Sequence, residues 1–428
     1  MGLIVWPGLE GRVKAVELPT GVRVLTQVAS ETRSATIGFW APVGSRDEAP
    51  GEHGATHFLE HLLFKGTSKR TAMDIAIEFD AIGGEFNAST SKEATAYYAR
   101  VLAEDAPVAV DVLADMVTSS LLDRLDFENE RGVILEELAM NQDDPADVAG
   151  EAFAAAVFGE HPLGRPISGR VEDIQAVTRD QVWDHYQRYY SPPRLVVVGT
   201  GAIDPDAFVE CVAEALERGG WGAGTRGSAS SIPRRSTVRT VALPDRGTSV
   251  TLAKPTEQAQ VLVGCEGLII TDARRYTMAA LVVALGGGMS SRLFQEIRER
   301  RGLAYSTYCF VSQFSDAGMF GLYAGCAPGA VGEVARLLDA EWERLAADGL
   351  ADEELARVKG HIKGASLLDL EEPYSTMNSL AQAEMTTGEV LSVKEMTARL
   401  DAVTGDQVRA LAAELAERPR SRVVLGPA

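Results

Sequence analysis

One short sequence pattern occurs twice at a long interval, and this repeat limits the possible folds more than any other feature. Residues Ala176–Val182 read AVTRDQV, and Ala402–Val408 read AVTGDQV. Each copy is followed by a helical pattern and then by an apolar strand pattern that ends in glycine, at Gly199 and Gly426. The copies lie 226 positions apart, which is far too long for a solenoid period. The repeat therefore predicts two tandem domains of one fold.

Each half mixes strand patterns with long helical runs. This mixture predicts the α+β class: two homologous domains, each a mainly antiparallel sheet packed with helices. A Gly- and Ser-rich stretch from Arg218 to Ser231 has the composition of a flexible linker. We therefore expect a first domain at residues 1–220, a linker at 221–240 and a second domain at 241–428.

Residues 57–61 read HFLEH. On a helix, His57 and His61 project from the same side, and Glu60 lies beside them. This arrangement is a zinc hydrolase signature, in which the two imidazoles bind the metal and the glutamate acts as general base. The alternative is a surface helix that carries two unrelated histidines.

The residues around this motif predict a single helix. Residues 52–56 lead into it, and Phe58, Leu59, Leu62 and Leu63 supply its apolar side. Residues 65–67, Lys-Gly-Thr, are expected to form a basic last turn, a glycine C-cap and an exit.

A hydrolytic zinc site takes three protein ligands and keeps one position open, so a third ligand is required. The segment 126–144 has a helical pattern and carries four candidate glutamates: Glu128, Glu130, Glu136 and Glu137. Glu130 and Glu137 lie two turns apart on one face, whereas Glu136 is rotated by about 100° from Glu137. A solvated acidic face is the alternative for this segment and accounts for Glu128 and Glu136.

The motif and its surroundings resemble the pitrilysin/insulinase superfamily of zinc peptidases. The likeness is strongest to its half-length branch, which includes the β subunit of mitochondrial processing peptidase and bacterial processing-peptidase-like proteins. It rests on HFLEH at 57–61, FKGT at 64–67 and ERGVILEE at 130–137. The resemblance implies a Zn²⁺ ion bound by His57, His61 and Glu137. It also implies that Glu60 is the catalytic base and that Glu130 supports the ligands from behind.

The resemblance extends to a strand that binds substrate. Residues 83–90, GGEFNAST, resemble the family strand that pairs with an extended peptide, and the next strand begins at Thr95. Pairing through the backbone would accept many peptide sequences. The resemblance implies substrate contacts at Asn87 and Ala88, and an ordinary hairpin is the alternative.

The second half lacks the metal motif. Aligning the halves places Ala280–Ala284 opposite His57–His61, with no ligand among them. Arg298 and Tyr305 match the Arg and Tyr that family members bring from the non-metal domain to the substrate. The resemblance therefore implies a catalytic role for both, and a solvated basic helix with a boundary tyrosine is the alternative.

Charge and composition limit the partners. A net charge of −20 argues against nucleic acid, which requires a basic surface, and suits cationic peptides. No apolar run is long enough to span a bilayer. The N-terminus lacks the cationic and apolar segments of a secretory signal, and the four cysteines form no C-x-x-C pair, so we expect reduced thiols. Arg also outnumbers Lys, as in GC-rich genomes, and we expect a bacterial cytoplasmic protein.

Together these features predict a zinc metalloendopeptidase that hydrolyses unstructured peptides or presequence-like segments inside a closed chamber. We expect a homodimer of half-length chains, with a heterodimer of homologous subunits as the other possibility. Two alternatives differ in function: a non-catalytic core or chaperone-like subunit, and a peptidase dedicated to one precursor peptide that works with a partner subunit.

Overall fold

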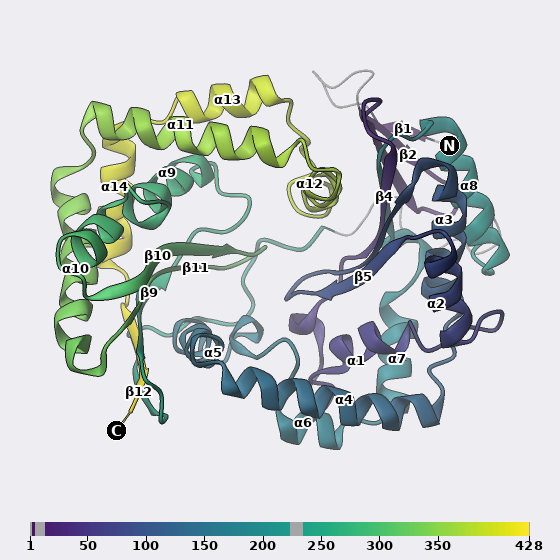
Figure 1. The fold of residues 1–428 in the computed structure, drawn as a ribbon, viewed down its shortest axis with the longest axis horizontal. Helices are drawn as coiled ribbons and strands as arrows, with labels where there is room; N and C mark the ends of the chain where they lie inside the picture. Colours follow the sequence, from purple (N-terminus) through teal and green to yellow (C-terminus); the bar gives the residue numbers. More distant parts are fainter. Residues whose placement is uncertain (1, 5–12, 223–233, 428) are drawn as a thin grey trace. The chain divides into compact units, whose positions relative to one another are not determined.

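The computed structural model describes residues 2–4, 13–222 and 234–427, and the chain forms two compact units (Figure 1). The first unit comprises Met1–Leu138, Pro166–Arg234 and Leu368–Ser392. The second comprises Ala139–Arg165, Arg235–Leu367 and Val393–Ala428. Each unit is therefore built from segments of both halves of the sequence.

The first unit is built on a seven-stranded sheet. Its strands are β1 (Gly2–Ile4), β2 (Val13–Glu17), β3 (Arg23–Val28), β4 (Ser34–Ala41), β5 (Glu85–Thr90), β6 (Thr95–Leu102) and β7 (Val196–Gly201). Their order is β1-β2-β3-β7-β4-β6-β5, and every neighbouring pair is antiparallel except β3 and β7. The helices are α1 (Ala55–Leu62), α2 (Ala72–Ala81), α3 (Ala106–Ser119), α4 (Arg124–Asp143), α6 (Val171–Ala176), α7 (Arg179–Tyr189), α8 (Pro205–Arg218) and α12 (Pro373–Met385). The last residues of α4, from Ala139 on, belong to the second unit.

Helices cover both faces of this sheet because alternate strand residues point to opposite sides. Val24 and Phe39 face the large core that contains α1, α3 and α8. Leu25 and Trp40, one position later in their strands, pack with Met377 of α12 on the other face.

The second unit is built on a five-stranded sheet. Its strands are β8 (Ser249–Ala253), β9 (Ala259–Glu266), β10 (Ala304–Gln313), β11 (Gly318–Cys326) and β12 (Ser421–Gly426). Their order is β10-β11-β9-β12-β8, with β12 and β8 as the one parallel pair. The helices are α5 (Pro145–Phe158), α9 (Arg275–Gly286), α10 (Val331–Asp348), α11 (Asp352–Asp369), α13 (Val393–Asp401) and α14 (Gly405–Glu417).

The two sheets share one topology, which confirms the predicted α+β fold with tandem homologous domains. Strands β3-β7-β4-β6-β5 correspond in order and direction to β8-β12-β9-β11-β10. The repeated heptapeptides start equivalent helices. Thr178 is the N-cap of α7 and Thr404 is the N-cap of α14, each in a capping box with the glutamine three residues later.

The compact units differ from the contiguous domains expected from the sequence. Helix α5, from the first half of the chain, packs Ala149 and Phe153 against Leu262 and Val423 of the second sheet. Helix α12, from the second half, covers a face of the first sheet (Figure 1). The expected boundary at residue 220 therefore separates α5 and α12 from the sheets that they cover. Amphipathic periodicity predicts that a helix buries one face, but not which sheet it covers.

Three other sequence expectations concern the linker, the cysteines and the membrane. Residues 223–233 of the predicted linker lie outside the described residues. All four cysteines are free of disulfides in the structure. Among the helices that the structure describes, none is long and apolar enough to cross a membrane.

Candidate metal centre

Helix α1 carries the HFLEH motif, but it is shorter than expected. It begins at Ala55, because Gly54 adopts φ +87° and cannot continue a helix backwards. It ends at Leu62, so Lys65 and Gly66 lie beyond it. The predicted helix, with a lead-in from residue 52 and a last turn at Lys65, was therefore too long at both ends.

The start of α1 is capped by a residue from outside the helix. The carboxylate of Glu48 is buried and accepts hydrogen bonds from the N–H groups of Gly54 and Thr56, both at 2.9 Å. A carboxylate at a helix N-terminus satisfies free N–H groups and interacts favourably with the helix dipole. On the same turn, the Thr56 hydroxyl lies 3.2 Å from Nε2 of buried His185.

Helix α4 brings the third candidate ligand to α1. Phe58 of α1 stacks on Phe127 of α4 with ring centroids 4.6 Å apart, and both rings are buried. The Nε2 atoms of His57 and His61 each lie 3.6 Å from Oε2 of Glu137. Possible ligand atoms of these three residues all lie within 4.8 Å of one another.

This donor set fits zinc. Two atoms bound to one tetrahedral zinc ion, at bond lengths of about 2.0–2.2 Å, lie roughly 3.3–3.6 Å apart. The measured separations of 3.6 Å match this range. Burial, and secondarily the charge of His61, lowers the pKa of His57 to about 4. Its imidazole is therefore neutral at pH 7 and keeps a lone pair for a metal.

The two histidines are held differently. Nδ1 of His61 lies 3.0 Å from Oε2 of buried Glu130, whose other oxygen is 2.7 Å from Nζ of Lys65. An Nδ1–H donated to Glu130 leaves Nε2 of His61 free as a metal ligand. Nδ1 of His57 has no hydrogen-bond partner among the described residues. Its ring instead packs edge-on against that of His61.

Glu60 lies next to the three candidate ligands. Burial raises the pKa of its carboxyl above the ordinary value, and the hydrogen bond from Thr90 partly offsets this effect. In that bond, the Thr90 hydroxyl donates to Oε2 of Glu60. A raised pKa suits a group that must take up and release a proton near neutral pH.

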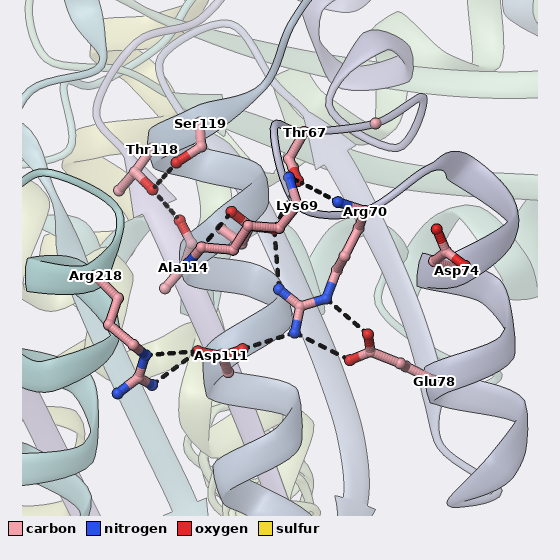
Figure 2. A network of polar contacts seen from close by, with 12 residues as sticks. Thr67, Lys69, Arg70, Asp74, Glu78, Asp111, Ala114, Thr118, Ser119 and Arg218 are labelled. Atoms are coloured by element: carbon pink, nitrogen blue, oxygen red, sulfur yellow. Dashed lines mark hydrogen bonds and ion pairs between the residues drawn. The ribbon is translucent and has the colours of Figure 1, made fainter.

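A polar network around Arg70 holds the loop that follows α1 (Figure 2). Arg70 donates to Glu78 of α2 at 2.8 and 3.1 Å. It also donates to Asp111 at 2.6 Å and to buried Asp115 at 2.9 Å, both on α3. Asp111 in turn accepts from Arg218 of α8. The guanidinium group therefore ties this loop to α2 and α3.

Asn87 and Ala88 lie on β5, the edge strand of the first sheet. Asn87 is exposed, while Ala88 is half-buried and packs against the core. One side of β5 pairs with β6, and the other side has no partner strand within the described chain. An edge strand of this kind offers backbone groups to an extended peptide.

Arg298 and Tyr305 lie together in the second unit. Arg298 lies in the last turn of the π-helical segment η5 (Phe294–Glu299), and Tyr305 is on the edge strand β10. The guanidinium carbon lies 4.4 Å from the Tyr305 ring centroid, and Nη1 donates to the Tyr305 carbonyl at 3.1 Å. The Tyr305 side chain is largely exposed. Contact of these two residues with a substrate stays a prediction.

Three residues of this site were not predicted from the sequence: Glu48, Lys65 and Thr90. Lys65 lies four residues after His61 and beyond the end of α1, so its closeness in the sequence was the only signal that could have found it. Glu48 and Thr90 are far from the motif in the sequence, and only the fold brings them to α1. The segment 280–284 lies in α9 and contains no metal-ligand side chain. The described part of the chain contains no second group of three possible ligands.

Two family models match the chain. The model of the insulinase family (peptidase family M16) matches residues 23–170, and that of the peptidase M16 inactive domain matches residues 176–361. The first match contains the three candidate ligands. The second covers the region in which the HFLEH motif has no counterpart.

Relatives of similar length carry the names of proteases. The chain is 47% identical to an uncharacterized zinc protease of Streptomyces coelicolor, over 97% of this chain and 90% of the relative. It is 42% identical to one of Mycobacterium tuberculosis, over 96% and 92%. It is 36% identical to one of Bacillus subtilis, over 97% and 98%.

Solved structures share the fold at low sequence identity. A protease from Helicobacter pylori superposes with a TM-score of 0.89 at 22% identity, over 97% of this chain and 99% of that one. A peptidase M16 inactive domain from Pseudomonas fluorescens gives 0.86 at 18% identity, over 97% and 98%. At these identities the likeness supports the fold alone.

Proposed function

Because the chain belongs to the insulinase family of peptidases, whose cofactor is Zn²⁺, we propose that it is a zinc metalloendopeptidase. The convergence of His57, His61 and Glu137 beside Glu60 is the observation that carries this proposal. Three protein ligands with a neighbouring carboxylate are typical of a catalytic zinc site, which keeps one position open.

The chain's own residues would divide the chemistry as follows. Zinc, when bound, supplies a Lewis acid that polarises a peptide carbonyl and lowers the pKa of water. Glu60 takes the proton from the attacking water and later gives it to the leaving amine. Glu130 keeps Nε2 of His61 directed to the metal.

We further propose that the substrates are unstructured peptides that pair with β5 near Asn87 and Ala88. The free edge of this strand supports the idea, because backbone pairing needs an extended segment that a folded protein does not offer. In this proposal Arg298 and Tyr305 contact the substrate inside a closed chamber, as hydrogen-bond donors to its developing negative charge. We also propose that the protein is cytoplasmic and forms a homodimer, or a heterodimer with a homologous subunit.

The experiment compares three glutamine variants with the wild type by zinc content and by cleavage of a peptide library. Glu60→Gln should keep zinc and lose turnover, because an amide cannot accept the proton. Glu137→Gln should lower zinc content sharply. Glu136→Gln is the matched control on an exposed neighbour and should keep both zinc and activity. Phenanthroline should abolish cleavage by the wild type.

Other outcomes favour the alternatives. Full activity in Glu60→Gln, or equal zinc loss in Glu136→Gln and Glu137→Gln, would show that the assigned roles are wrong. A wild-type protein that binds zinc but cleaves no peptide would favour a non-catalytic subunit. Cleavage of one precursor, and only with a second subunit present, would favour a dedicated maturation peptidase.

A further inference from the structure

Strand β5 ends at a residue that contacts the proposed base. The Thr90 hydroxyl donates to Oε2 of Glu60. Thr90 lies on the same side of β5 as Phe86 and Ala88, which pack against the core that contains α1. No residue of the described chain other than Thr90 donates a hydrogen bond to this carboxylate.

A short segment fixes the end of β5 relative to the start of α1. This bracket comprises residues 44–48. On one side, its N–H groups at Ser45 and Arg46 donate to the carbonyls of Ser91 and Lys92, both at 3.1 Å, in the turn that follows Thr90. Arg46 also pairs with Glu93 at 2.5 Å.

On its other side, the bracket ends in Glu48, which caps α1 through the N–H groups of Gly54 and Thr56. The approach to the turn is close. A Cβ atom on Gly44 would lie 2.3 Å from the backbone carbon of Lys92, so only glycine fits there. The bracket therefore connects the end of β5 to the start of α1, although these two elements are distant in the sequence.

A glutamate on a helix needs such support. Its side chain has several rotatable bonds, and a base must stay within hydrogen-bond reach of the proton that it removes. A hydroxyl bonded to an ionised carboxylate makes a strong, directional contact. We propose that Thr90 is a positioning residue, which holds the Glu60 carboxylate in its working orientation; this inference rests on the proposed function above.

The position of Thr90 on β5 has a further consequence. The strand proposed to pair with the peptide is the same strand that ends in the hydroxyl on Glu60. The same strand would therefore bind the substrate backbone and orient the carboxylate of Glu60. Thr90 does not need to touch the substrate for this effect.

The test compares Thr90→Val, Thr90→Ala and Thr90→Ser with the wild type. Valine keeps the shape but removes the hydroxyl, and alanine removes it without placing a methyl group near the carboxylate. Both should lower kcat roughly 10- to 100-fold, the loss expected when a reacting group is misplaced by about 1 Å. KM and zinc content should stay unchanged. Serine keeps the hydroxyl and should restore most of the activity.

Two controls separate positioning from a general structural effect. Thr36→Val removes a buried hydroxyl that has no partner within the described structure, from β4 of the same sheet, and should leave kcat unchanged. In a Glu60→Gln background, Thr90→Val should cause no further loss, because both changes remove one function.

The inference is wrong if both hydroxyl-free variants keep the wild-type kcat, if only KM rises, or if serine is as impaired as valine. Loss of zinc or of folding in Thr90→Ala together with the lost activity would also contradict it. A wild type without activity, or an active Glu60→Gln variant, would instead contradict the proposed function.

Discussion

Two titratable side chains at α1, His185 and Glu60, have pKa values that are shifted by burial. His185 is fully buried, and its one hydrogen-bond contact among the described residues is the Thr56 hydroxyl. Burial lowers the pKa of His185 to about 4. Glu60 shows the opposite direction for the same reason, since burial disfavours the charged form of either group.

His185 should make stability depend on pH. Its folded pKa of about 4 lies below the unfolded value of about 6.5, so the unfolded chain binds more protons between these values. The stability that its neutral form contributes is complete above pH 6.5 and is lost as the pH falls towards 4. We expect this residue to reduce the free energy of unfolding by about 2 kcal/mol from pH 7 to pH 5.

Urea unfolding of metal-free wild type and His185→Gln at both pH values measures this contribution. Glutamine keeps a nitrogen near Thr56 but does not titrate, so the variant should lose less stability on acidification. Parallel pH profiles for the two proteins would contradict the assigned pKa shift.

Helix α1 owes its position to residues outside it. Glu48 satisfies two N–H groups at its start, and stacking of Phe58 on Phe127 fixes it to α4. A helix of eight residues is too short to be stable by itself. The geometry of the metal centre therefore depends on these contacts.

Loss of the Glu48 cap should weaken both folding and metal binding. Glu48→Ala should cost about 1–2 kcal/mol of stability, as for other helix caps, and should lower zinc affinity because His57 is one turn away. Thr71→Ala removes the cap of α2 at Asp74 N–H and is the matched control. It should lower stability but leave zinc affinity unchanged. Chelator competition and urea unfolding measure the two effects, and equal zinc affinity in wild type and Glu48→Ala would contradict this role.

Elements with a local signal were predictable from the sequence. The helical patterns that follow the two repeats predicted α7 and α14, and the family resemblance of residues 83–90 predicted the strand β5. The motif itself identified His57, Glu60 and His61 as a group. The start of α1 was not predictable, because its cap comes from Glu48 across a turn rather than from the residue before the helix. The Thr90 contact was hidden for the same reason, since it depends on tertiary structure.

At the scale of the whole molecule, each half of the sequence supplies a helix to the core of the other unit. Met377 and Leu380 of α12 are buried against the first sheet. Phe153 of α5 is fully buried against the second. Burying side chains of this size contributes about 1.5–3 kcal/mol each.

Because α5 and α12 each pack on the sheet of the other half, the two halves of the chain should not fold when they are separated. A fragment of residues 1–220 lacks α12 and exposes the apolar face of α5, so it should aggregate or unfold rather than form an independent zinc-binding domain. Residues 241–428 should behave likewise. Mixing the two fragments should restore folded structure and zinc binding, as measured by circular dichroism and metal analysis. A soluble, cooperatively folded 1–220 fragment would contradict this prediction.

The exchange of α5 and α12 also bears on how such a chain can evolve. Two copies of one ancestral unit that merely followed each other could later separate into two genes, each product still folding alone. Once each copy contributes a helix to the other's hydrophobic core, neither gene fragment is viable without its counterpart. If the separated halves fail to fold as predicted, the duplicated halves would be inherited as a pair, and the copy without metal ligands would persist because α12 covers the first sheet and α5 covers the second.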